Sequence, residues 1–202
     1  MELHEVLRRR AMCRSFSAQP VDPALVDQIL EGALSAPTAG NTGGTSWVVL
    51  EGADQTAVYW DTTTDEPWQA RNAEWSGGLM RAPVVLLAYA SPEAYVERYA
   101  EPDKSDLELG AGPGGWPVPY WYGDAAFGVM AALLGAVDAG LGACVLGAFR
   151  GIEDLGTRLG VPPGWQLFCA VPLGHPDGQD HRSRSLRRPA RQRSERLHRG
   201  AW

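Results

Sequence analysis

The 202-residue chain has little cysteine and no long apolar run. Its three cysteines, Cys13, Cys144 and Cys169, are an odd number without C-x-x-C spacing. This excludes a disulfide-stapled secreted domain and is typical of reduced thiols in the cytoplasm. No apolar stretch reaches the roughly 20 residues that span a bilayer, so we expect no membrane association. The N-terminus also lacks the apolar segment and small-residue cleavage site of a secretion signal.

Several catalytic and binding motifs are also missing. The segment Gly110–Gly115 satisfies G-x-G-x-x-G, but Trp-Pro-Val-Pro follows it, so no helix can begin there to receive a dinucleotide. The chain has no P-loop and no G-x-S-x-G nucleophile motif. Its four histidines are scattered without the spacing of a zinc site. We therefore expect no metal centre.

Positive charge is sparse between the two ends of the chain. Residues 181–202 hold eight arginines and one acid, so with a net charge of −6 the other 180 residues carry −13. Four arginines gather near the N-terminus, at Arg8, Arg9, Arg10 and Arg14. A basic tail of this kind could contact nucleic acid, but the acidic body would repel a phosphate backbone. The alternative is that this arm folds onto its own acidic molecule or onto a partner, and we expect no nucleic-acid partner.

The order of predicted elements indicates an α+β fold. Apolar periodicity and capping signals predict helices over 2–10, 23–35, 92–100, 125–139 and 152–159. Short apolar runs predict strands over 46–51, 83–90, 142–149 and 165–174. We expect one domain over residues 1–202, with a sheet flanked by helices and a basic C-terminal arm over 181–202.

The segment 125–137 has no charged or hydrogen-bonding side chain. As a helix it would be about 20 Å long, which is too short to cross a membrane. A helix that is apolar all round is buried on every side, either at a domain centre or between two subunits. The preceding segment, 101–123, is predicted to be a loop, and a loop of that length is typical of a binding loop or lid.

Two guanidinium groups near the N-terminus could share one anion. Arg10 and Arg14 stand four residues apart, so on a continuing helix they would face the same side. A guanidinium group can donate two parallel hydrogen bonds to two oxygens of one phosphate. The interpretation left open for Arg8 and Arg9 is a solvated basic face.

Four patterns, in the same order along the chain, resemble the FMN-dependent nitroreductase-like flavoproteins. They are R-A-M-C-R-S-F at Arg10–Phe16, A-P-T-A-G-N at Ala36–Asn41, D-A-G-L-G-A-C-V-L-G at Asp138–Gly147, and L-G-H-P at Leu173–Pro176, with a closing H-R-G-A-W. The resemblance implies a nitroreductase-like α+β homodimer that binds FMN at each end of the subunit interface, with the long apolar helix at that interface. It also implies NADH or NADPH as the reductant.

The resemblance assigns roles to individual residues. The flavin phosphate would be held by Arg10, Arg14, the backbone of Met12, and either Arg188 or Arg191. The turn Pro37, Thr38, Ala39 and Asn41 would lie along the isoalloxazine edge. A backbone N–H around Leu146 and Gly147 would point at flavin N5, and no side chain would act as a general acid or base. In place of the family's Gln after this Asn, the chain has Gly43.

These features predict an FMN-dependent oxidoreductase. Hydride would pass from NAD(P)H through flavin N5 to a nitroaromatic, a quinone or a similar small acceptor. Four aromatic residues, Trp116, Tyr120, Trp121 and Tyr122, would form a wall for that planar acceptor, or they would only pack the loop against the dimer. The main alternative is a flavin-binding carrier or sensor without turnover, and a more distant one is a nucleic-acid accessory protein.

Overall fold

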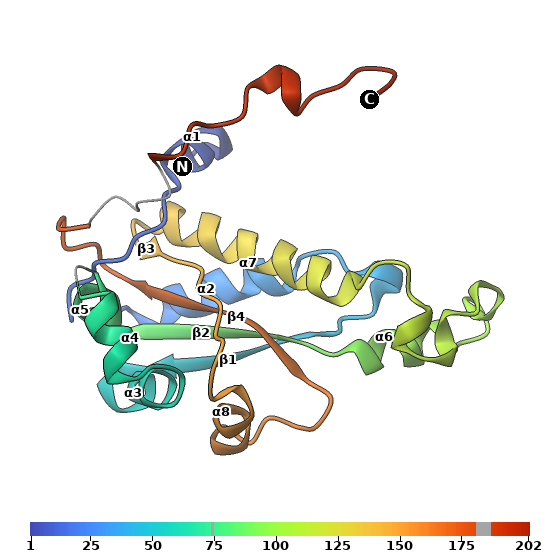
Figure 1. Ribbon diagram of the computed structural model, residues 1–202, viewed down its shortest axis with the longest axis horizontal. Helices are drawn as coiled ribbons and strands as arrows, with labels where there is room; N and C mark the ends of the chain where they lie inside the picture. Colours follow the sequence, from blue (N-terminus) through green and yellow to red (C-terminus); the bar gives the residue numbers. More distant parts are fainter. Residues whose placement is uncertain (74, 181–186) are drawn as a thin grey trace.

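The strands form one antiparallel sheet, in the order β1-β2-β4-β3. The computed structural model describes residues 1–73, 75–180 and 187–202. The strands in that order span Thr45–Glu51, Val84–Ala90, Gln166–Gly174 and Gly142–Ala143. Figure 1 shows helices on both faces of the sheet, with α2 and α7 above it and α3 and α8 below it. This arrangement confirms the expected α+β fold with a helix-flanked sheet.

Helices and short 3₁₀ turns make up most of the remaining structure. The α2/α7 side holds α2 (Pro23–Leu34) and α7 (Tyr120–Asp138), with α1 (Leu3–Arg9) in contact with α7. The opposite side holds α3 (Gly52–Thr63), α4 (Glu66–Arg71), α5 (Ser76–Met80) and α8 (Ile152–Arg158). Beyond the end of β2 lie α6 (Pro92–Tyr99) and the turns η2 (Ser105–Leu107), η3 (Leu109–Ala111) and η4 (Pro113–Gly115). Two further 3₁₀ turns are η1 (Ala39–Asn41) and η6 (Arg193–Glu195).

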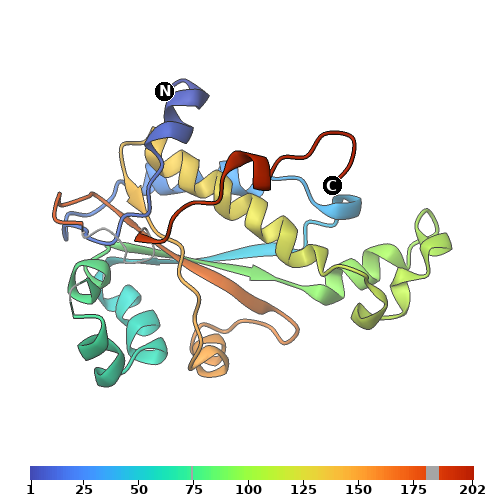
Figure 2. The same ribbon diagram turned by 45° about the horizontal axis from the view of Figure 1, so that its top comes forward.

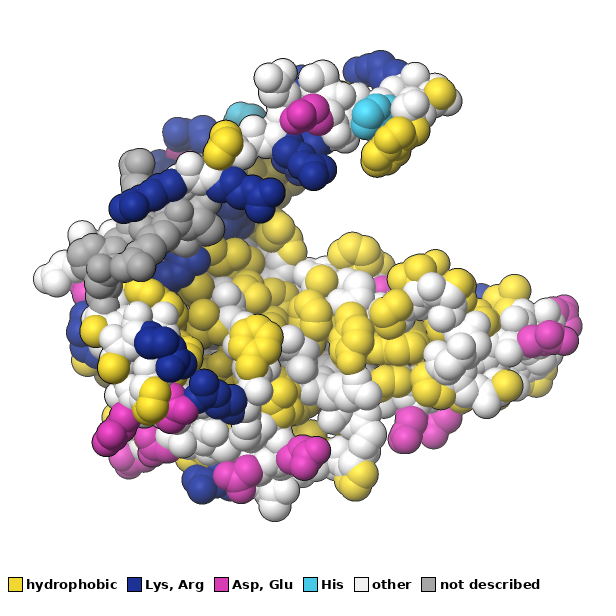
Figure 3. Space-filling model, in the orientation of Figure 1, with side chains coloured by type: hydrophobic (Ala, Val, Ile, Leu, Met, Phe, Trp, Pro, Cys, Tyr) yellow, Lys and Arg dark blue, Asp and Glu magenta, His cyan; other side chains and the backbone are white. Residues whose placement is uncertain are grey.

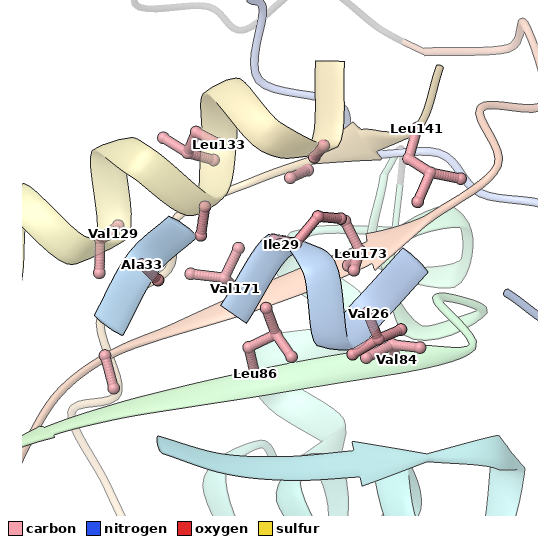
Figure 4. Close-up of a cluster of buried hydrophobic side chains, with 14 of the residues drawn as sticks. Val26, Ile29, Ala33, Val84, Leu86, Val129, Leu133, Leu141, Val171 and Leu173 are labelled. Carbon is pink, nitrogen blue, oxygen red and sulfur yellow. The ribbon is translucent and has the colours of Figure 1, made fainter. Parts of the chain in front are cut away.

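Strand β2 divides the hydrophobic core in two, because successive side chains point to opposite faces. Val84 and Leu86 pack against α2 and α7, together with residues of β4 (Figure 4). Val85 and Leu87 belong to the second core, which lies between the sheet and the helices α3, α5 and α8. All seven residues of β2 are buried, so this strand is apolar throughout instead of alternating.

Helix α2 begins where the sequence predicts. The Asp22 carboxylate accepts a hydrogen bond of 2.9 Å from the backbone N–H of Ala24, and Pro23 is the first helical residue. The helix packs closely along α7, since a Cβ on Gly128 would lie 3.1 Å from the backbone oxygen of Ala33. A side chain at position 128 would therefore push the two helices slightly apart.

The structure corrects three of the sequence predictions. Helix α7 begins at Tyr120, so residues 120–123 are not part of a loop. The predicted strand 142–149 is limited to Gly142–Ala143, with one further bridge between Leu146 and Ala170. Helices α3, α4 and α5 were not predicted. In α3 the apolar periodicity is weak and the threonines have low helix propensity.

One face of α7 is exposed in the single chain. Residues such as Ala125, Val129 and Ala132 are buried, whereas Phe127 and Met130 are 56% and 47% exposed. Figure 3 shows hydrophobic side chains along this region. The expected burial on every side is therefore not achieved within one chain. In the described ranges, no helix is long and apolar enough to cross a membrane.

The C-terminal arm lies away from the helices and the sheet. Residues 187–202 are all exposed, and Figures 1 and 2 show this segment on the α7 side of the sheet. Trp202 is fully exposed and stacks on His198, with ring centroids 4.5 Å apart. The part of the predicted arm from 181 to 186 lies outside the described residues.

Candidate functional site

Arg10 and Arg14 lie on the segment after α1, which joins the end of the sheet. Helix α1 ends at Arg9, so Arg10 and Arg14 do not share a helical face, and this prediction was wrong. Met12 instead forms a parallel bridge with Ala143, and the Cys13 N–H donates to the Ala143 oxygen at 2.9 Å. This pairing brings the predicted phosphate ligands next to the segment that leads to Gly147.

Arg14 has hydrogen-bonding capacity left for a ligand. Its Nη1 donates to the Met12 backbone oxygen at 3.3 Å, and no other described residue accepts from this guanidinium. The Arg14 backbone N–H donates to the Asp180 carboxylate at 3.2 Å. The side chain is partly buried, so its remaining N–H groups are held near a fixed backbone and can bind an anion.

A polar cluster around Asp177 anchors this segment. The Ser15 hydroxyl and Arg81 Nη2 each donate to Asp177 Oδ2 at 2.8 Å. Arg81 also donates from Nε to the Phe16 oxygen at 3.1 Å. The Gln179 N–H, the Ser15 hydroxyl and the Arg81 guanidinium together lower the pKa of Asp177. The cluster therefore holds residues 14–16 against the end of β4, and sequence reasoning missed it because its members are far apart in the chain.

A pocket of about 220 Å³ opens beside Arg14. Its lining is polar, and it consists of Arg14, Ser15, Ala73, Trp75, Gly77, Gly78, Arg81 and Gln179. A Cβ on Gly78 would lie 2.5 Å from the Ser15 hydroxyl oxygen and 3.1 Å from the Arg14 backbone oxygen. Glycine at this position thus lets α5 approach the arginine segment closely enough to form the pocket wall.

Hydrogen bonds of the backbone show which of Leu146 and Gly147 has an N–H available for flavin N5. Leu146 exchanges two hydrogen bonds with Ala170, at 2.8 and 2.9 Å, so its N–H is already used. Over the ranges that the structure describes, the Gly147 N–H has no hydrogen-bond acceptor. Gly147, and not Leu146, is therefore the residue whose backbone can donate to a ligand.

The predicted Pro37–Asn41 turn is rigid. Thr38 accepts hydrogen bonds from the Asn41 N–H at its backbone oxygen and from the Gly43 N–H at its hydroxyl, both at 2.9 Å. The Ala39 N–H donates to the buried Asp124 carboxylate at 2.7 Å. The Asn41 side-chain amide makes no hydrogen bond to a described residue, so it is available to a ligand.

This turn and the arginine segment lie at opposite ends of α7. Asp124, which binds the turn, is in the second helical turn, whereas Ala143, which pairs with Met12, follows the C-terminal end. Residues 124 and 138 are separated by about 21 Å along a helix axis. One chain therefore unites Arg10, Met12 and Arg14 with Leu146 and Gly147, but it does not bring Pro37, Thr38, Ala39 and Asn41 to the same place.

The four predicted acceptor-binding aromatics have different environments. Trp116 and Trp121 are 8% and 7% exposed and pack on Tyr95 in a buried cluster. Tyr120 is 43% exposed. Tyr122 stacks on Phe168, with centroids 6.0 Å apart, and donates to Gln166. The two tryptophans therefore pack within the chain, on α6, while contact with an acceptor or with a second subunit stays a prediction for the two tyrosines.

Another aromatic pocket, of about 120 Å³, lies beside Gly147. It is lined by Tyr59, Trp60, Thr63, Thr64, Trp68 and residues 146–150. Trp60 is 3% exposed, and its indole N–H has no partner among the described residues. Phe149, on the other wall, is 90% exposed. Sequence reasoning missed this pocket because its walls come from α3 and α4.

The C-terminal arginines stand apart from the other candidate ligands. Arg188 and Arg191 are exposed, and no ion pair joins either of them to another described residue. Their contact with a phosphate stays a prediction.

The cysteines and acidic groups supply no other reactive centre. Burial raises the pKa of Cys13, and it raises the pKa of Cys144 to about 11 and of Cys169 to about 12, so these thiols stay protonated at neutral pH. Within residues 1–73, 75–180 and 187–202, no three His, Cys, Asp or Glu side chains gather as a metal site would require.

Comparisons with known proteins identify the family and the fold. The model of the nitroreductase family matches residues 7–175. The nitroreductase CinD from Lactococcus lactis, solved in complex with nicotinic acid, is 16% identical over 98% of this chain and 100% of its own, with a TM-score of 0.77. A nitroreductase-like protein from Streptococcus mutans is 15% identical over 96% of both chains, with a TM-score of 0.74. A protein described as a nitroreductase from Desulfovibrio desulfuricans, solved in complex with FMN, is 21% identical over 100% of this chain and 98% of its own, with a TM-score of 0.68.

Proposed function

The chain belongs to the nitroreductase family, and on that premise we propose that it is an FMN-dependent oxidoreductase using NADH or NADPH. When bound, FMN would supply the redox chemistry, namely hydride transfer through N5 between a nicotinamide and a nitroaromatic, a quinone or a similar small acceptor. The protein contributes binding, orientation and exclusion of water. The observation that carries the proposal is the Met12–Ala143 pairing, which joins the arginine segment to the segment that leads to Gly147.

The residues present suit a flavin mononucleotide. Arg14 retains guanidinium donors for a phosphate, and the nearby Arg10 side chain makes no described contact that would compete. The Gly147 N–H can donate to a ring nitrogen. The Asn41 amide can both donate to and accept from the edge of a flavin ring.

We propose that two chains complete each site. The Asn41 turn lies about 21 Å along α7 from the arginine segment, and α7 exposes Phe127 and Met130 between these two ends. A symmetric pair that buries this face would place the turn of one chain near the arginines of its partner. In this dimer, residues 1–202 of each chain act as one domain, and the 181–202 arm brings Arg188 or Arg191 to the phosphate.

The pocket beside Gly147 suits the planar acceptor. Its walls include Tyr59, Trp60, Trp68 and Phe149, and its volume of about 120 Å³ is on the scale of a single aromatic ring. Tyr120 and Tyr122, on the exposed start of α7, would contact the outer side of a larger acceptor.

The chain departs from the family pattern at Gly43 and Gly44, and the structure explains the second. A Cβ on Gly44 would collide with the ring of the buried Tyr95, so the proline that the family pattern has at this position has no room there. The turn instead packs directly on α6. Flavin contacts on this side therefore rest on Asn41.

Two measurements on the purified protein test the proposal. The first is the absorption spectrum of the protein after incubation with FMN and removal of free flavin. A bound oxidised flavin absorbs at about 350 to 500 nm. The second is oxidation of NADH or NADPH with menadione or a nitrofuran as acceptor. Bound flavin with turnover supports the oxidoreductase, and bound flavin without turnover supports a carrier or sensor. A protein that retains no FMN contradicts both.

A further inference from the structure

Asp124 is an acidic residue in an apolar helix. It is the only charged residue between positions 120 and 137, and it is 5% exposed. Burial of a carboxylate is costly unless hydrogen bonds compensate it. Two donors do so, the Ala39 N–H and the Tyr95 hydroxyl, each at 2.7 Å from Oδ2. One oxygen atom therefore joins α7, α6 and the turn that precedes β1.

The turn that Asp124 binds has an unfavourable backbone conformation. Gly40 and Asn41 both have positive φ angles, of 65° and 53°. Glycine adopts this region freely, but asparagine does so at a cost and needs support from its surroundings. We therefore expect this turn to depend on the hydrogen bonds that anchor it.

Helix α6 supports the same turn from its other side. Arg98 Nε donates to the Gly40 oxygen at 2.9 Å, and the ring of Tyr99 packs against Gly40. The Arg98 guanidinium is itself fixed by Asp103, with both bonds at 2.8 Å. Three consecutive turn residues are thus constrained, while the Asn41 amide remains without a described partner. The backbone around Asn41 is thus held in one conformation, while its side-chain amide stays available to bind a ligand.

We propose that Asp124 is a positioning residue that holds the 38–42 turn in the conformation that presents Asn41 to the flavin. The inference rests on the proposed function and assigns two roles that the motif alone does not. Asp124 consumes the Ala39 N–H, so Ala39 is a structural residue and not a flavin ligand. Asp124 is 5% exposed and its Oδ2 accepts from both Ala39 and Tyr95, so we expect it to act on the flavin through the turn.

The test compares Asp124→Asn with the wild-type protein in three measurements. They are the FMN dissociation constant from flavin fluorescence at 20 °C, the visible circular dichroism of bound FMN at saturation, and the melting temperature. Asparagine keeps the size of the side chain, but it replaces an oxygen of the carboxylate by a donor and removes the charge. The amide oxygen can still accept from Ala39 and Tyr95, but both bonds lose their charge assistance, which predicts a dissociation constant raised about tenfold and an altered circular dichroism band. Asp27→Asn, the same change at an exposed position on α2, should match the wild type in all three.

The outcomes separate positioning from stability. A lower melting temperature with an unchanged dissociation constant and unchanged circular dichroism would overturn the proposal, because Asp124 would then only stabilise the fold. If Asp124→Asn does not fold, Tyr95→Phe removes only the hydroxyl, and it should raise the dissociation constant in the same direction; an unchanged value in that folded variant would equally overturn the proposal. A wild-type protein that binds no FMN would instead refute the proposed function, and the inference with it.

Discussion

Replacing Phe127 with alanine tests whether the exposed face of α7 forms a subunit interface. A phenylalanine side chain and backbone present about 200 Å² to solvent, and 56% of Phe127 is exposed, so an interface that covers it buries about 110 Å². At about 25 cal/mol per Å², this burial stabilises the dimer by about 3 kcal/mol for each chain. Because each chain of a symmetric dimer contributes one Phe127, the dissociation constant of the dimer should rise by up to about 10⁴-fold in Phe127→Ala.

The assay is the molar mass in solution, measured by light scattering over a series of concentrations from nanomolar to micromolar. The wild type should remain dimeric where Phe127→Ala dissociates, and the variant should also lose FMN at those dilutions. Ile152→Ala provides the control, because Ile152 is 38% exposed on α8, on the other side of the sheet. A variant with the mass profile of the wild type, or a wild type that is monomeric throughout, would refute the role of this face.

Three other predictions concern the phosphate end of the site. Replacing Arg10 and Arg14 together by alanine should give a folded, colourless protein, since both side chains are largely free of other contacts; stoichiometric FMN in the purified variant would exclude these ligands. Deleting residues 181–202 should weaken flavin retention and dimerisation together, and an equally yellow, dimeric truncation would show that the arm is not needed. The Gln179 N–H, Ser15 and Arg81 lower the pKa of Asp177 from 3.8, so its ionised form stabilises the folded state above that pH and this contribution is lost as the pH falls through the lowered pKa. Asp177→Asn should therefore reduce the free energy of unfolding at pH 7, and the difference from wild type in urea denaturation should disappear once the pH falls below the lowered pKa of Asp177; a difference of equal size at neutral and at strongly acidic pH would contradict the electrostatic cause.

Local signals in the sequence predicted most of the sheet and several helices. Asp22 followed by Pro23 marks the start of α2 because both residues satisfy the needs of a helix N-terminus by themselves. The continuous apolar run at 84–90 similarly identifies the central strand. These features need no knowledge of distant residues.

Features that depend on tertiary contacts were not predictable in the same way. Helix α3 has threonines whose hydroxyls return to its own backbone, as Thr63 does to Tyr59, and its tyrosine and tryptophan are held by packing under the sheet. The anchoring of Ser15 through Asp177 joins residues 162 positions apart. The motif patterns located the candidate site, but the separation of its two parts along α7 emerged only from the folded chain.

Mixed dimers provide the most direct test of the claim that two chains complete each flavin site. One chain would carry Arg10→Ala and Arg14→Ala, and the other Asn41→Gly, which removes the amide while retaining the positive φ angle of 53°. Differently tagged chains would be co-expressed, and the heterodimer would be isolated through both tags before its FMN content is measured. Sites built from two chains predict one intact site per heterodimer, and so one FMN, although each homodimer binds almost none. A heterodimer as empty as the homodimers would contradict the account, because every site would then lie within a single chain.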